Sequence, residues 1–324
     1  MIVVPLMRNP LVFTAAVMTV GIICFSIGLG LAVNSWVVAI LLLAGLAGLA
    51  AGAANAARLV LAKFRSSQYL LWTLQCDRAV REILSQPRYA DPLRLNRFET
   101  KVYSQGGEDG VLQEIFRRIG VVNRTFCEFG AADGLQNNTV FLLNLGWGGL
   151  WIEGGAPAVH RASRRFASYI KEGKLQIKNA FVTAENIESL FDEARLPQEF
   201  DLLSLDIDRN DYYVWERIER YRPRVVVLEF SSIFPPGVDW VIPYDATAVW
   251  DGTSRTGASL SAYERLGLQK GYALVGCSLS GVNAFFVRTD LAEGKFAAPF
   301  TAENHYEPPR HFFNWYTPGQ SRNP

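Results

Sequence analysis

Residues 125–134 read TFCEFGAADG, and this stretch decides the fold class. The mainly apolar run Thr125–Phe129 carries one acid, Glu128, and leads into Gly130, with Gly134 four residues later. A buried parallel strand that enters a tight glycine turn and then a helix has this pattern. Glycines let a backbone approach a ligand, and the free N–H groups of the following helix point to the same place. The stretch therefore predicts a ligand site at the end of a first strand.

The spacing of the two glycines, G-x-x-x-G, differs from the G-x-G-x-x-G of dinucleotide-binding proteins, so a nicotinamide enzyme is disfavoured. Glu128 lies close before the first glycine and suits a ligand with a cationic amino-acid end. S-adenosylmethionine (SAM) is such a ligand. A glycine turn with a purely structural role is the alternative.

Short apolar runs alternate with helical segments downstream of this stretch. Strands are predicted at Thr125–Phe129, Gly149–Ile152, Leu175–Lys178, Leu202–Leu205 and Val225–Leu228. Helices are predicted between them, at Asn137–Leu145, Pro157–Glu172, Ala184–Ala194 and Tyr212–Arg220. Tyr272–Ser278 and Val282–Val287 then flank Ser280-Gly281 and predict a β-hairpin. Five parallel β/α units closed by an antiparallel hairpin are the layout of a Rossmann-like SAM methyltransferase sheet.

Each predicted strand ends at a polar residue, and the carboxyl ends of parallel strands meet at one edge of the sheet. Glu153 ends the second strand, where a carboxylate can accept hydrogen bonds from both hydroxyls of a ribose. After the third strand, Phe181-Val182-Thr183 is placed to flank an adenine ring, and Val182 is the predicted contact. Core or helix-cap roles for these three residues are equal alternatives.

Acidic and amide side chains crowd the exit of the fourth strand, at Asp206, Asp208, Asn210 and Asp211, and Glu229 ends the fifth strand. Carboxylates this close repel one another and are costly to bury, so they predict a proton to be taken, a hydroxyl donor or a cation. Asp206, Asp208 and Glu229 are the predicted catalytic residues. No metal is assigned, although Mg²⁺ held by Asp206, Asp208 and Asn210 is an alternative. Asp211 as a helix cap is the structural alternative.

The segment after the fifth strand is rich in aromatic residues, namely Phe234, Trp240, Tyr244 and Trp250. We predict that it forms a lid, which contributes to an acceptor pocket and excludes water. An ordinary loop is the alternative.

The N-terminal part predicts a membrane hairpin. Residues 11–33 and 36–57 are uncharged apolar runs, each about long enough to cross a bilayer at 1.5 Å per residue. Arg8 precedes the first run, and Arg58, Lys63 and Arg65 follow the second, whereas the turn between the runs has no charge. By the positive-inside rule both ends of the hairpin are placed in the cytoplasm. The chain is thus predicted to be a multi-pass protein of the inner (cytoplasmic) membrane. A signal peptide is disfavoured because the second run follows at once.

These patterns divide the chain into three parts. Residues 1–65 form the transmembrane hairpin, residues 66–98 an amphipathic helix at about Ser66–Ser85 and a linker, and residues 99–324 the globular domain. The net charge of +1 gives no support for a nucleic-acid partner. The four cysteines are scattered and suggest neither a disulfide framework nor a zinc site.

The domain resembles the FkbM-like family of SAM-dependent methyltransferases over about residues 103–287. The matching pieces are Ser104-Gln105 with Glu108-Asp109, EFGAADG, the exit at Glu153, LDID at Asp206, and Glu229. Runs like WDGTS–GASL, GVNAFFVR and HYEPPR look closest to a bacterial subgroup. The membrane hairpin is not part of the family pattern.

The resemblance implies that SAM is the cofactor and that the reaction is O-methylation of a hydroxyl on a sugar, a lipid-linked glycan or a small molecule. Asp206 or Glu229 would take the hydroxyl proton. Arg209 stands where the family has glycine and would fill part of the pocket or pair with Asp206 or Asp208. A catalytically inactive membrane binding or assembly module is the alternative function. The implied cofactor contacts are Glu128, Gly130, Ala131, Asp133, Gly134, Glu153, Gln105 and Val182.

Overall fold

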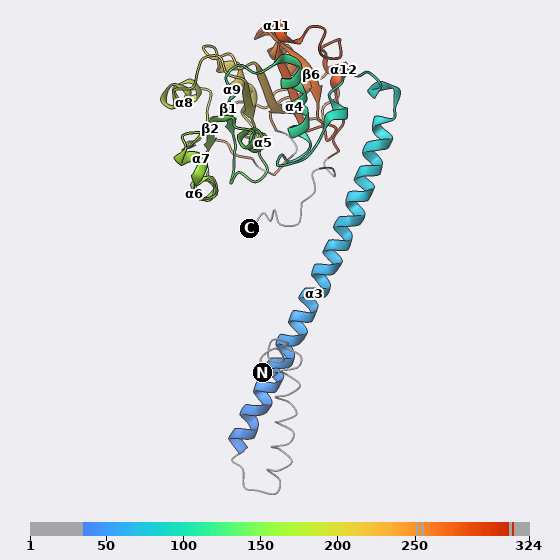
Figure 1. Cartoon of the computed structure of the whole chain (residues 1–324), viewed down its shortest axis with the longest axis vertical. Coiled ribbons are helices and arrows are strands. Elements are labelled where there is room, and N and C mark those ends of the chain that lie inside the picture. The colour runs from blue at the N-terminus through green and yellow to red at the C-terminus, as the bar shows by residue number, and fades with distance from the viewer. Residues whose placement is uncertain (1–34, 251, 254–255, 311–312, 314–324) are drawn as a thin grey trace. The chain divides into compact units, whose positions relative to one another are not determined.

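The computed structural model describes residues 35–250, 252–253, 256–310 and 313. The chain divides into two compact units between Gln75 and Cys76. The long helix and the α/β domain are therefore described separately (Figure 1).

Helix α3 covers Ser35–Leu84, a length of 50 residues. It is the one helix among the described residues that is long and apolar enough to cross a membrane. The predicted second span, residues 36–57, lies in its first half, and the predicted first span, residues 11–33, lies outside the described residues. The two-helix hairpin therefore stays a prediction. The helix predicted at Ser66–Ser85 is not a separate element, because residues 58–65 contain no Gly or Pro that would end α3.

The segment after α3, predicted to be a linker, is packed on the α/β domain. It contains two short 3₁₀ helices, η1 (Pro87–Tyr89) and η2 (Asn96–Phe98). Tyr89 and Leu95 are each 2% exposed. The domain therefore begins before Glu99, the predicted boundary.

Seven strands form one sheet in the order β3-β2-β1-β4-β5-β7-β6. Strands β1 to β5 are parallel, and β7 is antiparallel to both of its neighbours. This confirms the predicted Rossmann-like methyltransferase sheet with a terminal hairpin. Each predicted strand is present to within one residue at either end. The strands are β1 Thr125–Phe129, β2 Gly148–Glu153, β3 Leu175–Asn179, β4 Leu202–Leu205, β5 Val225–Glu229, β6 Tyr272–Cys277 and β7 Asn283–Arg288.

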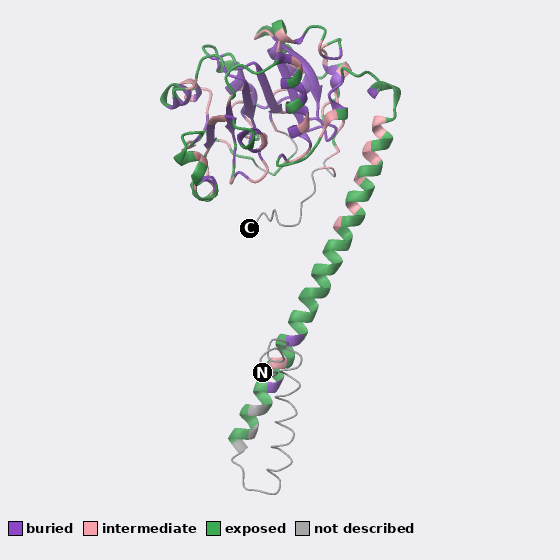
Figure 2. Ribbon diagram, viewed as in Figure 1, coloured by how far each residue is buried: buried purple, intermediate pink, exposed green. Residues whose placement is uncertain are grey.

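Helices cover both faces of the sheet, and alternate strand residues point into two cores. Phe126 and Trp151 pack with helices α4 to α6, whereas Phe129 and Leu203 pack with α8 to α10. Apart from the edge strand β3 and the first residues of β2, the strands are accordingly buried on both faces (Figure 2). The helices are α4 Glu108–Ile119, α5 Val140–Asn144, α6 Ala156–Arg165, α7 Ala167–Lys171, α8 Ile187–Ala194, α9 Asp211–Arg217, α10 Leu260–Gln269, α11 Thr289–Ala292 and α12 Ala302–His305.

A buried ion pair holds the loop before β1. Asp201 is fully buried and accepts a 2.7 Å bond from Nη1 of Arg224. The Asp201 carboxylate also accepts bonds from the backbone N–H groups of residues 122–124. Arg224 donates to the carbonyl oxygens of Ile119 and Gly120. The pair therefore fixes the chain between α4 and β1.

Replacing Asp201 by Asn leaves the Arg224 charge buried without its partner. We expect the free energy of unfolding to fall by roughly 3–5 kcal/mol. Urea unfolding of the full chain in micelles, followed by tryptophan fluorescence, measures it. The control is Asp290→Asn, which removes the partly exposed carboxylate paired with Arg288, and because Arg288 also binds Glu199 the change should cost about 1 kcal/mol or less. Equal losses in the two variants would contradict the account.

Candidate active site

The two glycines after β1 are required by the packing of the protein itself. Gly130 has φ 67°, and a Cβ there would lie 1.7 Å from the carbonyl oxygen of Asp206. Gly134 has φ 79°, and its Cβ would lie 2.4 Å from the ring of Phe166. Both glycines thus have a reason within the protein itself, and close approach of a ligand to them stays a prediction.

Glu128 faces the protein interior and holds the loop that follows β1. Its buried carboxylate accepts a 2.8 Å bond from the N–H of Asn138 and further bonds from the side chains of Asn137 and Thr139. These bonds keep residues 137–139 out of the helix, so α5 begins at Val140 and has only five residues. The predicted helix start beside the glycine turn is wrong for this reason. Burial raises the pKa of Glu128 to about 7.

Glu153 stands beside the glycine turn, as predicted. The N–H of Gly130 donates to the carbonyl oxygen of Ile152 at 3.0 Å, which brings the ends of β1 and β2 together. The carboxylate of Glu153 accepts bonds from the N–H of Ala132 at 2.9 Å and of Gly155 at 2.6 Å. Each oxygen keeps a further lone pair, so the carboxylate can still accept hydrogen bonds from a ligand.

The side chains of three other predicted cofactor contacts lie in the hydrophobic cores or beside arginines. Val182 and Ala131 are 5% and 2% exposed and belong to the hydrophobic cores. Asp133 lies within 3.7 Å of Arg161 and 3.5 Å of Arg165 on α6. The aromatic residue that the prediction passed over in favour of Val182 is Phe181, whose ring is 47% exposed. It lies against Gly154, next to Glu153.

Gln105 lies in a turn that two buried acids close. Asp109 accepts bonds from the N–H groups of residues 102–104, at 2.7 to 2.8 Å. Glu108 accepts bonds from the N–H groups of Gly106 and Gly107 and from the side chain of Asn283, the first residue of β7. The half-buried Gln105 is thereby held near the strand ends. Its cofactor contact stays a prediction.

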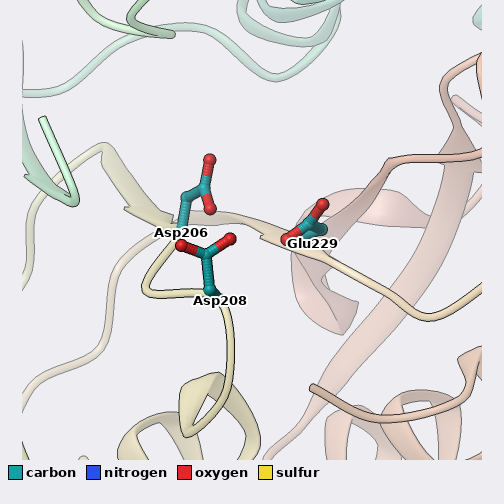
Figure 3. A group of neighbouring side chains, drawn as sticks. All are labelled: Asp206, Asp208 and Glu229. Carbon is teal, nitrogen blue, oxygen red and sulfur yellow. The ribbon is translucent and has the colours of Figure 1, made fainter. Parts of the chain in front are cut away.

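The three predicted catalytic acids come together. Asp206 follows β4, Asp208 lies in the next turn, and Glu229 ends β5 (Figure 3). One carboxylate oxygen from each lies within 4.8 Å of the others. Three oxygen ligands at this spacing are also a place where a divalent cation could bind. The group is called the acid cluster here.

The acid cluster is arranged to hold protons near neutral pH. Burial, Asp208 and Asp211 raise the pKa of Glu229 to about 8. The pKa of Asp206 is raised well above its usual value by reduced hydration and then by Glu229 and Asp208. Because the Asp206 side chain reaches solvent, we regard the repulsion by its neighbours as the firmer cause.

The turn after Asp208 is joined to the predicted lid. Asp211 accepts a 2.9 Å bond from the N–H of Ile207, so it closes this turn. Asn210 donates to the carbonyl oxygen of Asp245 at 2.8 Å. Hydrogen bonds from Thr247 lower the pKa of Asp245, and the charge of Arg209 adds to this effect. The positive φ of the turn, 68°, falls on Asp208, so the bulky Arg209 next to it carries no such backbone strain.

A pocket of about 290 Å³ opens beside the acid cluster. The predicted lid supplies part of its wall. Trp250 is 53% exposed there, and its indole N–H donates to the carbonyl oxygen of Thr253. The lining combines acids, hydroxyls and apolar groups, including Asp208, Glu229, Ser232, Trp250, Thr256 and Val282.

Several solved structures of methyltransferases resemble this chain. A putative caffeoyl-CoA O-methyltransferase from Staphylococcus aureus is 16% identical, with TM-score 0.40, over 69% of this chain and 99% of that one. A SAM-dependent methyltransferase from Clostridium acetobutylicum is 11% identical, with TM-score 0.37, over 65% and 98%. A glycopeptide N-methyltransferase complexed with SAM is 13% identical, with TM-score 0.33, over 54% and 85%.

At these identities the likeness concerns the fold alone, and no ligand or reaction is inferred from it. No family model matches the sequence. No curated protein matches it either.

The pKa of Glu128 predicts a loss of stability as the pH rises. The folded protein keeps a proton that the unfolded chain releases above about pH 4.5, so the free energy of unfolding falls between about pH 4.5 and 7. Glu128→Gln should remove roughly 2–3 kcal/mol of this decline. Urea unfolding at pH 5 and 7.5 measures it, with the exposed Glu172→Gln as the control. A decline unchanged by Glu128→Gln would contradict the assignment.

Proposed function

We propose that this protein is a SAM-dependent O-methyltransferase. The observation that carries the proposal is the arrangement along one sheet edge. Glu153 and the β1 loop lie on one side of the contact between Gly130 and Asp206, and the acid cluster with its pocket lies on the other. A cofactor site and an acceptor site are thus adjacent.

The residues on the β1–β2 side fit an adenosyl group. Glu153 has the free lone pairs that two ribose hydroxyls need, and its position is fixed by the two backbone N–H groups. Phe181 offers an exposed ring face beside it for the adenine. The β1 loop would then hold the amino-acid end. When bound, SAM supplies a methyl group activated by its positive sulfur.

The residues on the β4–β5 side fit a hydroxyl acceptor. Holding an acceptor hydroxyl in line with the methyl group is the main contribution of such a site. Glu229 would accept the hydroxyl proton, since a carboxylate whose pKa lies near the working pH is an efficient base. Asp206, whose pKa is also raised, is the other candidate for this role. The hydroxyls of Ser232 and Thr256 would bind further oxygens of the acceptor. The pocket volume suits a single sugar ring or a small molecule.

Helix α3 would anchor the enzyme to the cytoplasmic membrane, with the domain in the cytoplasm, where SAM is made. At 1.5 Å per residue the helix is about 75 Å long, more than twice the hydrocarbon thickness of about 30 Å. The helix is therefore longer than the bilayer requires. A lipid-linked glycan remains a candidate acceptor under this proposal.

Calorimetry with SAM on the full chain in nanodiscs tests the cofactor site. The wild type should bind, and Glu153→Ala should weaken binding by about 10- to 100-fold because two charge-assisted hydrogen bonds are lost. Glu172→Ala, an exposed acid at the end of α7, is the matched control. Absence of heat from the folded wild type would overturn the proposal and favour the inactive membrane module.

Transfer of labelled methyl groups from SAM into cytosolic and membrane extracts tests the base. Glu229→Gln and Asp206→Asn should each lower the rate by about 10² to 10⁴ and leave SAM binding intact. The wild-type rate should rise with pH up to about 8, because the carboxylate must lose its proton to act as a base. A rate that is constant from pH 6 to 9, or unchanged in Glu229→Gln, would remove this role. The same assay with a metal chelator shows whether a cation contributes to the rate.

A further inference from the structure

The C-terminal tail, residues 302–310, carries a carboxylate that neither solvent nor the pocket reaches. Glu307 is fully buried. The hydroxyl of Tyr89 donates to its two oxygens at 2.9 and 2.8 Å, and Nη1 of Arg310 donates at 2.9 Å. Burial and Glu307 raise the pKa of Tyr89 to about 12, so its hydroxyl stays a donor. A buried carboxylate with this many partners is costly to disturb.

Arg310 connects this carboxylate to the turn between β6 and β7. Its Nη1 donates to the carbonyl oxygen of Leu279 at 2.8 Å, and its backbone N–H donates to the carbonyl oxygen of Ser280 at 2.8 Å. Gly281 has φ 70°, and a Cβ there would lie 2.5 Å from the carbonyl oxygen of Pro308. The tail therefore lies directly behind residues 278–282.

The tail also supports the loop after β5. The hydroxyl of Tyr306 donates to the carbonyl oxygen of Ser232 at 2.7 Å. Ser232, Gly281 and Val282 line the pocket on this side, and we call them the pocket wall. No described residue of the tail lines the pocket, so the tail acts from behind the wall.

The segment that follows α3 binds the other side of the tail. Arg88 donates to the carbonyl oxygens of Asn304 and Tyr306. Arg94 donates to the carbonyl oxygen of Asn304 at 2.9 Å. These bonds join positions more than 200 residues apart in the chain. The start and the end of the domain thus meet behind the pocket wall, with Glu307 at the centre.

We propose that Glu307 is a positioning residue, which fixes the pocket wall by joining the segment after α3 to the tail. The role of the pocket as the acceptor site rests on the function proposed above. The segment that follows α3 is then part of the support of the pocket and not only a connection between α3 and the domain.

The test uses the full chain in nanodiscs with a cysteine in the wall. Val282 is 8% exposed, so in Val282→Cys the rate of alkylation by N-ethylmaleimide reports opening of the wall. Cys24 and Cys76 are replaced by Ser. Cys127, fully buried in β1, reports global unfolding in the same sample, and mass spectrometry reads each site. Glu307→Gln keeps the shape but removes the negative charge and one of the two acceptor oxygens that Tyr89 and Arg310 share.

Glu307→Gln should speed alkylation at position 282 by about fivefold, the ratio expected for losing one ordinary hydrogen bond, with Cys127 unchanged. Tyr89→Phe is a milder change that should also speed alkylation at position 282. It replaces Glu307→Gln in the test if Glu307→Gln does not fold. Glu303→Gln, an exposed acid of the same tail, should leave the rate as it is. Unchanged alkylation at position 282, or a parallel rise at Cys127, would overturn the positioning role.

Calorimetry with SAM separates this inference from the proposed function. Glu307→Gln should keep the wild-type affinity for SAM, since the tail supports the acceptor side only. If the wild type does not bind SAM but the alkylation rates change as stated, the proposed methyltransferase function is wrong and the positioning role of Glu307 is kept. If SAM binds and the rates do not change, the positioning role alone fails.

Discussion

The close approach of Gly130 to the backbone of Asp206 is the constraint on which the site depends. β1 lies between β2 and β4. Directly after β1 the backbone of Gly130 is so close to Asp206 that a Cβ on Gly130 would overlap the Asp206 carbonyl oxygen. The positive φ of Gly130 turns the loop toward Glu153 on β2. One backbone contact thereby sets the distance between the side of the sheet that fits an adenosyl group and the side that holds the acids.

Acids serve two different purposes in this domain. Asp201, Glu307 and Glu114 are paired with arginines, and Glu128 with hydrogen-bond donors, so each holds a loop, a tail or a helix in place. In the acid cluster three carboxylates face one another instead. Mutual repulsion disfavours the charged forms, so the cluster can take up a proton near neutral pH. That property suits a group that exchanges protons with a ligand.

The strands and the outline of the site could be predicted from the sequence because both depend on local pattern. Continuous apolar runs mark strands buried on both faces, and residues at the ends of parallel strands must share one edge, which is why Glu153, Asp206 and Glu229 were placed correctly along it. The sequence could not show which of Phe181 and Val182 is exposed, because an exposed aromatic residue and a core residue look alike without tertiary contacts.

The remaining differences come from partners far apart in the chain. Glu128 binds residues 137–139 and so shortens the helix that the sequence pattern favours. The segment after α3 looks like a linker because its buried contact, Tyr89 with Glu307, lies 218 residues away. No local pattern reports such contacts. The same holds for Gly134, whose close neighbour is the ring of Phe166, the residue between α6 and α7.

A structure of the full chain with S-adenosylhomocysteine, the demethylated product, tests the account most directly. We expect the ribose hydroxyls on the carboxylate of Glu153, the adenine along Phe181, and the sulfur directed across Gly130 toward Asp206 and Glu229. A nucleoside bound elsewhere, or a β1 loop that occupies this space while Glu153 turns to solvent, would contradict it.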